Sequence, residues 1–268
     1  MTSDAVLYSE AKDDLSVHIL NGRFDRLSSA QVTEAIFRAI RARERGILCT
    51  VNVAILMMMR SNPRLQRFVE SSRWSVADGQ PIIWVSHLQR QPLPERVTGI
   101  DLIDLLCARA TRENIGVYFL GADDRSVRTA AAALQARHPG LDVRGCANGY
   151  FDSEQARSRA EAVATSGAEI LFVAMGVPRQ ECFIEDQWEH LGARIVVGVG
   201  GSLDVIAGLR KRAPAFVQRA GLEWAYRLAQ EPRRLFRRYL VTNSKFIGLM
   251  SWTAFAHAIH LRRMIPPA

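Results

Sequence analysis

The sequence has few cysteines. Four occur among 268 residues, far apart and without a Cys-x-x-Cys pair: Cys49, Cys107, Cys146 and Cys182. This spacing argues against a disulfide-stabilised framework. Three of the four lie beside apolar residues, so we expect buried free thiols in a reducing cytosol.

Long hydrophobic runs are also missing. Residues 1–14 are polar and acidic, so we expect no secretory signal there. The longest uncharged apolar stretch covers residues 246–261 and includes Ser251 and Thr253. A transmembrane helix needs about 20 apolar residues. We therefore expect this stretch to lie in a membrane interface and not to cross the bilayer.

Complete nucleotide-binding and metal-binding motifs are absent as well. The sequence contains no full Gly-x-Gly-x-x-Gly or Walker motif and no Asp-x-Asp. His257 and His260 are three residues apart, but no acid or cysteine accompanies them, so we expect no metal site there. A dinucleotide cofactor and ATP are both poorly supported.

Positive charge, in contrast, is concentrated near the C-terminus. Residues 210–268 hold twelve Lys or Arg and two acids, a net charge of +10, whereas the whole chain has +8 and residues 1–209 therefore have −2. The basic residues alternate with aromatic and aliphatic ones at helical spacing, which is typical of helices that bind an anionic membrane surface. The alternative is an ordinary helical subdomain with a solvated basic face.

The remaining pattern predicts an α/β fold. Apolar runs at 47–51, 116–120, 170–175 and 195–199 predict strands, and helical patterns occupy 30–43, 64–71, 81–89, 101–112, 126–137, 154–166, 180–191 and 203–209. This alternation predicts a Rossmann-like, mostly parallel sheet with helices on both faces, plus a small helical C-terminal appendage. We place the boundary near Gly208, which gives an α/β domain at 1–208 and the appendage at 209–268.

The ends of the predicted strands carry polar or glycine-rich signatures. The first strand runs into Thr50-Val51-Asn52, and Gly176 follows the third strand and Gly200 the fourth. Ligands of open α/β sheets bind outside the carboxyl ends of the strands, and glycine lets a phosphate approach the backbone. These ends predict a nucleotide-type pocket, although each glycine alone is equally consistent with tight packing.

Three charged residues admit two interpretations each. Asp78 lies in a tight turn before a helix, where it is either a functional carboxylate or a turn or N-cap residue. Arg96 is either a pocket residue or half of a surface salt bridge, and Asp101 is either functional or a helix cap.

Ordered motifs extend over about residues 25 to 247. They are Thr50-x-Asn52, Ala77-Asp78-Gly79, Pro94-Glu95-Arg96-Val97-x-Gly99-x-Asp101, Tyr118-Phe119-Leu120-Gly121, Asn148-Gly149-Tyr150-Phe151, Gly176-x-Pro178-x-Gln180-Glu181, Gly198-Val199-Gly200, Arg212-Ala213-Pro214, Gly221-Leu222-Glu223-Trp224-x-Tyr226-Arg227-Leu228 and Glu231-Pro232-x-Arg234-Leu235-x-Arg237-Arg238-Tyr239. In this order and spacing they strongly resemble the WecG/TagA/CpsF family of glycosyltransferases.

The resemblance implies an inverting, UDP-sugar-dependent hexosyltransferase that works without a metal or other cofactor. The acceptor would be a polyprenyl-diphosphate-linked saccharide in the synthesis of exopolysaccharide or another cell-surface polymer. The donor sugar would be N-acetylmannosamine, N-acetylmannosaminuronic acid or a hexose such as glucose. The enzyme would bind peripherally to the cytoplasmic face of a bacterial inner membrane, and in solution it would have the option of forming a homo-oligomer.

The resemblance also implies roles for individual residues. Asp78 would be the general base, with Thr50, Arg96 and Gln180 beside it in the catalytic set. The substrate-binding set would include Asn52, Arg227, Arg234 and Arg237. To these we add Gly176 and Gly200 from the strand ends, and Tyr150 and Asp204 as candidate contacts to the uridine. The arginines would neutralise the departing UDP. Arg227, Arg234 and Arg237 are spaced i, i+7 and i+10, and Pro232 interrupts that helical face.

Two other classes of protein remain as alternatives. An NAD-type Rossmann oxidoreductase shares the α/β prediction, but it requires glycines after the first strand, where this chain has Thr50-Val51-Asn52-Val53-Ala54. A nucleic-acid-binding protein would explain the pI of about 9.8 and the interleaved basic and aromatic residues. The apolar run at 246–261 favours lipid over nucleic acid, so we expect no nucleic-acid partner.

Overall fold

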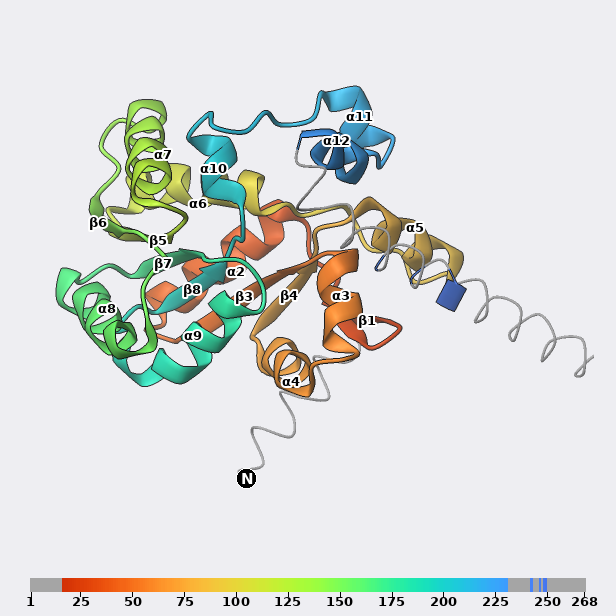
Figure 1. Ribbon diagram of the computed structural model, residues 1–268, viewed down its shortest axis with the longest axis horizontal. Coiled ribbons are helices and arrows are strands. Elements are labelled where there is room, and N and C mark those ends of the chain that lie inside the picture. Colours follow the sequence, from red (N-terminus) through yellow and green to blue (C-terminus); the bar gives the residue numbers. More distant parts are fainter. Residues whose placement is uncertain (1–15, 231–241, 243–245, 247, 250–268) are drawn as a thin grey trace, which may run out of the picture.

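The computed structural model describes residues 16–230 together with Thr242, Phe246, Gly248 and Leu249. Its centre is a six-stranded parallel sheet with strand order β4-β3-β8-β7-β5-β6. The strands are β3 (Gly46–Val51), β4 (Trp74–Ala77), β5 (Val117–Gly121), β6 (Val143–Ala147), β7 (Ile170–Ala174) and β8 (Ile195–Gly198). Helices cover both faces (Figure 1), which confirms the predicted Rossmann-like α/β class.

The two faces of the sheet are covered by different helices, and alternate residues of the strands point to each. One core contains Leu48, Phe119 and Phe172 and is covered by α2 (Ser29–Arg41), α6 (Gly99–Glu113), α7 (Asp124–Arg137) and α10 (Ser202–Ile206). The rings of Phe119 and Phe172 stack there with centroids 5.2 Å apart. The other core contains Val51, Leu120 and Val173 and is covered by α3 (Val53–Met59), α4 (Pro63–Ser71), α5 (Gln80–Leu88), α8 (Ser153–Ser166) and α9 (Arg179–Gln187), which the 3₁₀ turn η1 (Trp188–His190) follows.

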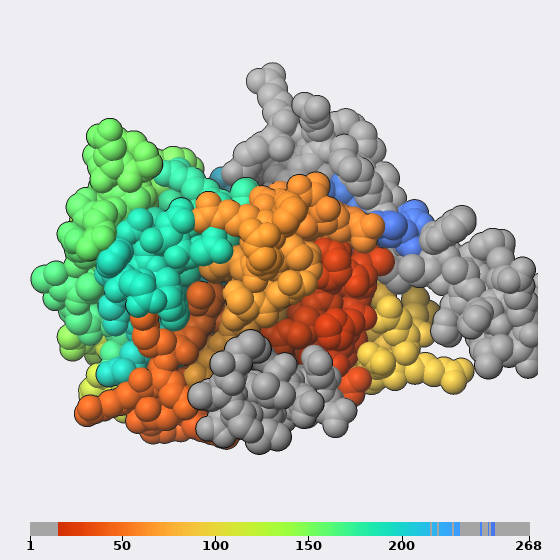
Figure 2. All heavy atoms as spheres, turned by 90° about the horizontal axis from the view of Figure 1, so that it is seen from below, coloured from red at the N-terminus to blue at the C-terminus, as the bar shows by residue number. Residues whose placement is uncertain are grey.

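An antiparallel hairpin of β1 (Ser16–Ile19) and β2 (Gly22–Asp25) precedes the sheet. Its Val17, Ile19 and Phe24 are fully buried in the second core. In the view from below, the hairpin and the α3–α4 region form one continuous surface, red beside orange (Figure 2). The Asp25 carboxylate accepts a hydrogen bond of 2.8 Å from the backbone nitrogen of Ser75, so the hairpin is anchored to β4.

The predicted strands match β3, β5, β7 and β8, and the eight predicted helices match α2 and α4 to α10. The hairpin, β4, β6 and α3 were not predicted. β4 has only four residues. β6 is an edge strand, and Arg144 and Gly145 interrupt its run of apolar residues in the sequence. α3 has the sequence VAILMMM and is buried on almost every side, so it shows no amphipathic period.

After α10, an extended segment leads into two short helices, α11 (Ala215–Arg219) and α12 (Glu223–Gln230), which lie above the sheet edge near α5 (Figure 1). The predicted division at Gly208 falls in the link between α10 and this segment and stays a prediction.

Phe246, the first residue of the apolar run at 246–261, is 5% exposed and packs in the second core, whereas most of that run lies outside the described residues. Within the described part of the chain, no helix combines the length and the hydropathy that crossing a membrane requires.

Candidate functional site

A cavity of about 1140 Å³ opens at the carboxyl ends of the parallel strands. Nine of the twelve predicted site residues line it: Thr50, Asn52, Asp78, Arg96, Tyr150, Gly176, Gln180, Gly200 and Asp204. They come from separate parts of the sequence, and they meet because all six strands point their carboxyl ends at the same edge. The side chain of Arg227 and the whole of Arg234 and Arg237 lie outside the described part of the structure.

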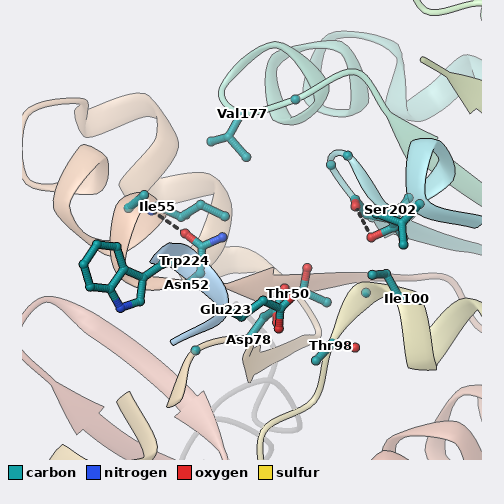
Figure 3. A pocket seen from close by; sticks show the side chains of 18 of the residues that line it. Thr50, Asn52, Ile55, Asp78, Thr98, Ile100, Val177, Ser202, Glu223 and Trp224 are labelled. Atoms are coloured by element: carbon teal, nitrogen blue, oxygen red, sulfur yellow. Dashed lines mark hydrogen bonds between the residues drawn. The ribbon is translucent and has the colours of Figure 1, made fainter. Parts of the chain in front are cut away.

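The loops after β3, β4, β7 and β8 form one side of this cavity. We call the group Thr50, Asn52, Asp78, Gly176 and Gly200 the strand-end wall. Figure 3 shows Thr50, Asn52 and Asp78 close to one another at this wall, with Glu223 beside them.

Asp78 is placed by the turn between β4 and α5. Its backbone nitrogen donates to the carbonyl of Val51 at 2.9 Å, which fixes the turn against the end of β3. The N-cap of α5 is Gly79, without a side-chain cap, so the interpretation of Asp78 as an N-cap is wrong. The half-buried carboxylate lines the cavity, near enough for its charge to act on the guanidinium of Arg212.

Thr50 and Asn52 have structural contacts as well as cavity positions. The Thr50 hydroxyl donates to the carbonyl of Gly198 at 3.2 Å, across the β3–β8 pair. Asn52 is the N-cap of α3, and its Oδ1 accepts from the backbone nitrogen of Ile55 at 3.1 Å. The cap uses the amide oxygen of Asn52, so its amide nitrogen is the group that it can offer to a ligand (Figure 3).

Gly176 and Gly200 have positive φ angles of 77° and 53°. A Cβ atom at either position would meet no other atom within 4 Å, so each glycine is required by its backbone conformation and leaves open space above it. Gln180, 3% exposed, supports the second glycine, because its Oε1 accepts from the backbone nitrogen of Gly200 at 3.1 Å.

Tyr150 and Asp204 mark two other parts of the rim. The Tyr150 ring is 73% exposed, and the guanidinium of Arg179 lies 5.8 Å from its centroid. The Asp204 carboxylate is ion-paired with Arg210 at 3.1 Å. The positive charge of Arg210 therefore offsets the negative charge that Asp204 would present to a ligand.

Another part of the cavity lining is apolar. We call Trp84 and Leu88 of α5, Leu209 before the extended segment, and Leu222 and Trp224 of the α11–α12 region the helical wall. Of the eight large hydrophobic side chains that are exposed in the described chain, six line this one cavity: these five and Tyr150. Gly221, just before α12, packs closely against the Trp84 ring of α5, because a Cβ atom at this position would lie only 2.7 Å from the ring.

Arg96 connects the two walls. Its guanidinium donates to Glu223 Oε2 at 2.6 Å and to Gln218 Oε1 at 3.1 Å, and the Arg96 and Glu223 side chains are each 14% exposed. Arg96 therefore lines the cavity and also forms a salt bridge, but this pair is half-buried and is not the surface salt bridge of the alternative interpretation.

Asp101 also contacts the C-terminal segment. It is the third residue of α6 and not its N-cap, which is Thr98. Its carboxylate accepts from Arg212 at 2.6 Å and from the Thr98 hydroxyl at 2.7 Å. Burial alone would raise the pKa of Asp101, but the hydrogen bonds from Arg212 and Thr98 outweigh it, and the pKa is lowered. Asp101 therefore stays charged at neutral pH.

Among the residues that the structure describes, no group of three His, Cys, Asp or Glu side chains is arranged to hold a metal ion. The four thiols are free: Cys49 and Cys107 are buried, whereas Cys146 and Cys182 are half-buried. Burial raises the pKa of Cys49 to about 12, so it is not a thiolate ligand or nucleophile at neutral pH.

A comparison with known protein families shows the family of the chain. Residues 17–259 match the glycosyl transferase WecG/TagA/CpsF family. The chain belongs to this family of glycosyltransferases. A relative from Bacillus spizizenii (strain ATCC 23059 / NRRL B-14472 / W23), described as an N-acetylglucosaminyldiphosphoundecaprenol N-acetyl-beta-D-mannosaminyltransferase, is 36% identical over 196 residues, which cover 73% of this chain and 75% of the relative.

The helical wall is the part of this glycosyltransferase that sequence reasoning missed. Trp84 and Leu88 are spaced i, i+4 on α5, and Ile82, Ile83 and Val85 of the same helix are buried. A helix that is apolar on its buried face and also has an apolar pair on the other face signals a second contact surface. Glu181, considered below, was quoted only as part of a motif.

Proposed function

We propose that this glycosyltransferase moves a sugar from a UDP-sugar to a saccharide carried on a polyprenyl diphosphate, with inversion at the anomeric carbon. The observation that carries the proposal is a single cavity that is lined both by the polar strand-end wall, which includes Asp78, and by the apolar helical wall. A volume of about 1140 Å³ leaves room for more than one drug-sized molecule. Family membership supports the transfer reaction.

The donor occupies the strand-end wall in this proposal. The open backbone at Gly176 and Gly200 lets a diphosphate approach the main-chain nitrogens. The exposed Tyr150 ring, with Arg179 beside it, offers a flat surface on which uracil stacks. The N-terminus of α7 contributes less, because Asp123 already caps it by accepting from the backbone nitrogen of Ser126 at 2.8 Å.

The acceptor enters along the helical wall. Its saccharide hydroxyl must reach the anomeric carbon, while the first isoprene units lie on Trp84, Leu88 and Trp224. Exposed apolar side chains that gather at one cavity are suited to an amphiphilic substrate. The relative's printed acceptor, an undecaprenyl diphosphate, has this chemistry.

Asp78 is the general base of the proposed reaction. Its carboxylate removes the proton of the acceptor hydroxyl while that oxygen attacks the anomeric carbon from the face opposite the diphosphate. The bond between the anomeric carbon and the diphosphate oxygen breaks, and UDP leaves with the electron pair. The product is the lengthened acceptor with an inverted anomeric centre.

The charge of departing UDP is neutralised by arginines, and we propose that no metal or other cofactor is needed. Arg96 and Arg212 are described candidates that line the cavity, and they are hydrogen-bonded to the carboxylates of Glu223 and Asp101, respectively. Arg227, Arg234 and Arg237 are proposed to contribute the remaining charge.

The membrane is the proposed location, at its cytoplasmic face and by peripheral contact. Arg210 and Arg212 are ion-paired with Asp204 and Asp101, so they hold the C-terminal segment on the body. The basic residues after Arg212 would then be the ones that contact anionic lipid. In solution, where no membrane is present, we propose that a second copy of the chain packs on the apolar surface. Liposomes with anionic lipid should bind the protein, and single-stranded DNA at the same salt concentration should not.

The decisive test is UDP release with a polyprenyl-diphosphate-linked acceptor, in EDTA, for the wild type and Asp78→Asn. UDP-N-acetylmannosamine, its uronic acid and UDP-glucose are compared as donors, with the first expected to react, since the relative transfers N-acetylmannosamine. Asp78→Asn should lower kcat by roughly 10²–10⁴-fold and leave UDP binding unchanged. NMR of the product gives the anomeric configuration.

Each component of the proposal has its own negative result. Activity that survives Asp78→Asn would show that Asp78 is not the general base. Activity that is lost in EDTA and restored by Mg²⁺ would show that the enzyme needs a metal. A retained anomeric configuration removes the inverting mechanism. Folded protein that releases no UDP from any donor and binds no UDP by calorimetry contradicts the donor class.

A further inference from the structure

Glu181 is a buried carboxylate next to the cavity that the proposed mechanism does not use. It is the residue after Gln180 on α9, is 7% exposed, and does not line the large cavity. It borders a separate cavity of about 10 Å³, which Cys49, Thr50 and Gly198 also line. One of its oxygens, Oε2, is buried without a hydrogen-bond partner. A buried acid is costly to retain, so its position calls for an explanation.

The other oxygen of Glu181 contacts the Gln180 side chain. Gln180 Nε2 donates to Glu181 Oε1 at 2.8 Å, and Gln180 Oε1 accepts from the backbone nitrogen of Gly200 at 3.1 Å. The backbone nitrogen of Gly200 only donates, so the Gln180 oxygen faces Gly200 and the Gln180 nitrogen faces Glu181 Oε1, which accepts from it. If the amide were reversed, its nitrogen would face the Gly200 nitrogen, and that contact would be repulsive.

The Gln180 amide also lies directly against the end of β8. A Cβ atom at Gly198 would be 2.9 Å from Gln180 Nε2, so glycine is required there by the close approach of this amide. Gly200, two residues later, has a φ of 53° and lies on the cavity side of the turn into α10. The chain of contacts from Glu181 through Gln180 to Gly200 therefore supports the strand-end wall from behind.

We propose that Glu181 is a positioning residue: by fixing the orientation of the Gln180 amide, it holds the Gly200 turn in the shape that receives the donor diphosphate. The inference rests on the proposed function for the identity of the donor. It predicts a specific defect in donor binding, because Glu181 does not line the large cavity and its contacts lead through Gln180 to Gly200 of the strand-end wall.

Two variants separate this role from simple core packing. Glu181→Gln keeps the volume and a carbonyl oxygen that accepts from Gln180 Nε2, whereas Glu181→Met keeps the length but removes the acceptor. We expect Glu181→Met to weaken UDP binding by at least about tenfold in calorimetry and to raise KM for the donor, with KM for the acceptor within twofold of wild type. Glu181→Gln should bind UDP within about twofold of wild type.

A third measurement needs no variant. In ¹⁵N-labelled wild type, the signals of Gln180 Nε2 and the Gly200 amide should shift together as Glu181 is titrated. This readout is independent of activity and applies even if Glu181→Met does not fold.

The outcomes decide the proposal as follows. Equal loss in Glu181→Met and Glu181→Gln, normal UDP binding by folded Glu181→Met, or Gly200 and Gln180 signals that do not respond to the titration would each overturn it. If wild type binds no UDP, the proposed donor class fails. In that case the linked signals still decide whether Glu181 positions Gly200.

Discussion

The strand-end wall and the helical wall of the cavity differ in how they are built. The strand-end wall consists of residues at and just after the strand ends, which are held by backbone geometry and by hydrogen bonds such as those from the Thr50 hydroxyl to the Gly198 carbonyl and from the Gly200 nitrogen to Gln180 Oε1. The helical wall consists of large apolar side chains on α5, on α12 and in the segments that follow α10 and precede α12; Trp84 is 49% and Trp224 38% exposed. A wall of backbone and polar groups is suited to a charged, precisely shaped ligand, whereas an apolar wall is suited to a flexible hydrocarbon chain. We therefore expect substitutions in the two walls to affect different substrates.

The largest effect concerns Glu181, behind the strand-end wall, and is an effect on stability. Burial raises the pKa of Glu181 from its ordinary value of 4.5 to about 7, so the native state holds this proton more tightly than the unfolded chain. The stabilisation is complete below pH 4.5 and is lost as the pH rises to 7, by about 3 kcal/mol at roughly 1.4 kcal/mol per pH unit. Urea unfolding of wild type at pH 5 and pH 7.5 measures this loss.

Glu181→Gln is the control, because an amide does not titrate. The difference in the free energy of unfolding between wild type and Glu181→Gln should change between pH 5 and pH 7.5 and be constant above that range. The pKa values of the Cys49 and Cys182 thiols are also raised, by burial above all and partly by the charge of Glu181. Both thiols therefore titrate at a higher pH than Glu181 does. A difference that is the same at both pH values would mean that Glu181 is ionised throughout.

The second prediction tests the strand-end wall at Asn52. Asn52→Asp keeps the N-cap of α3, because aspartate caps as well as asparagine, but it removes the amide donor and adds a negative charge. Beside a bound diphosphate this should weaken UDP binding by about 10- to 100-fold, measured by calorimetry. Asn52→Ser, which keeps a cap without the charge, should lose less. If Asn52→Asp binds UDP normally, Asn52 serves only as a helix cap.

The third prediction tests the helical wall. Trp84→Ala should raise KM about tenfold for an acceptor with a long polyprenyl chain and leave KM unchanged for a short-chain, water-soluble analogue, since the ring contributes apolar area. Leu105→Ala is the matched control, because Leu105 is 40% exposed on α6 and does not line the cavity. An equal change for both acceptors would show that Trp84 supports the wall without binding the chain.

The two walls also differ in how far the sequence predicts them. The strand-end residues lie next to the strands of a parallel sheet, and once β3, β7 and β8 are recognised their convergence follows from topology. Asp78 was assigned from the family resemblance, since the Ala-Asp-Gly turn before a helix is equally typical of a structural turn and β4 itself was not predicted. The contact between Gln180 and Gly200 joins residues 20 positions apart and follows from three-dimensional packing alone.

The helical wall depends on contacts that no local pattern contains. Trp84 meets Gly221, and Arg96 meets Glu223 across 127 positions in the sequence. Propensity and periodicity predict that α5 exists, but they do not indicate which segment covers its second apolar face. The same limit explains why Arg210 and Arg212 were assigned to a membrane-binding segment, although their ion pairs hold that segment on the body.

The smallest effect concerns the connection between the walls. If the half-buried pair of Arg96 and Glu223 ties α12 to the body, a double-mutant cycle with Arg96→Gln and Glu223→Gln should give a coupling free energy of about 1 kcal/mol in thermal or urea unfolding. The pair of Arg137 and Asp104 is the control: its N–O distance of 2.7 Å is similar, but its side chains are 49% and 40% exposed. Solvent screens such a pair, so its coupling should be no more than about 0.5 kcal/mol. Equal coupling in the two cycles would mean that burial does not strengthen the Arg96 contact, and that the helical wall is held by its apolar packing on Trp84 instead.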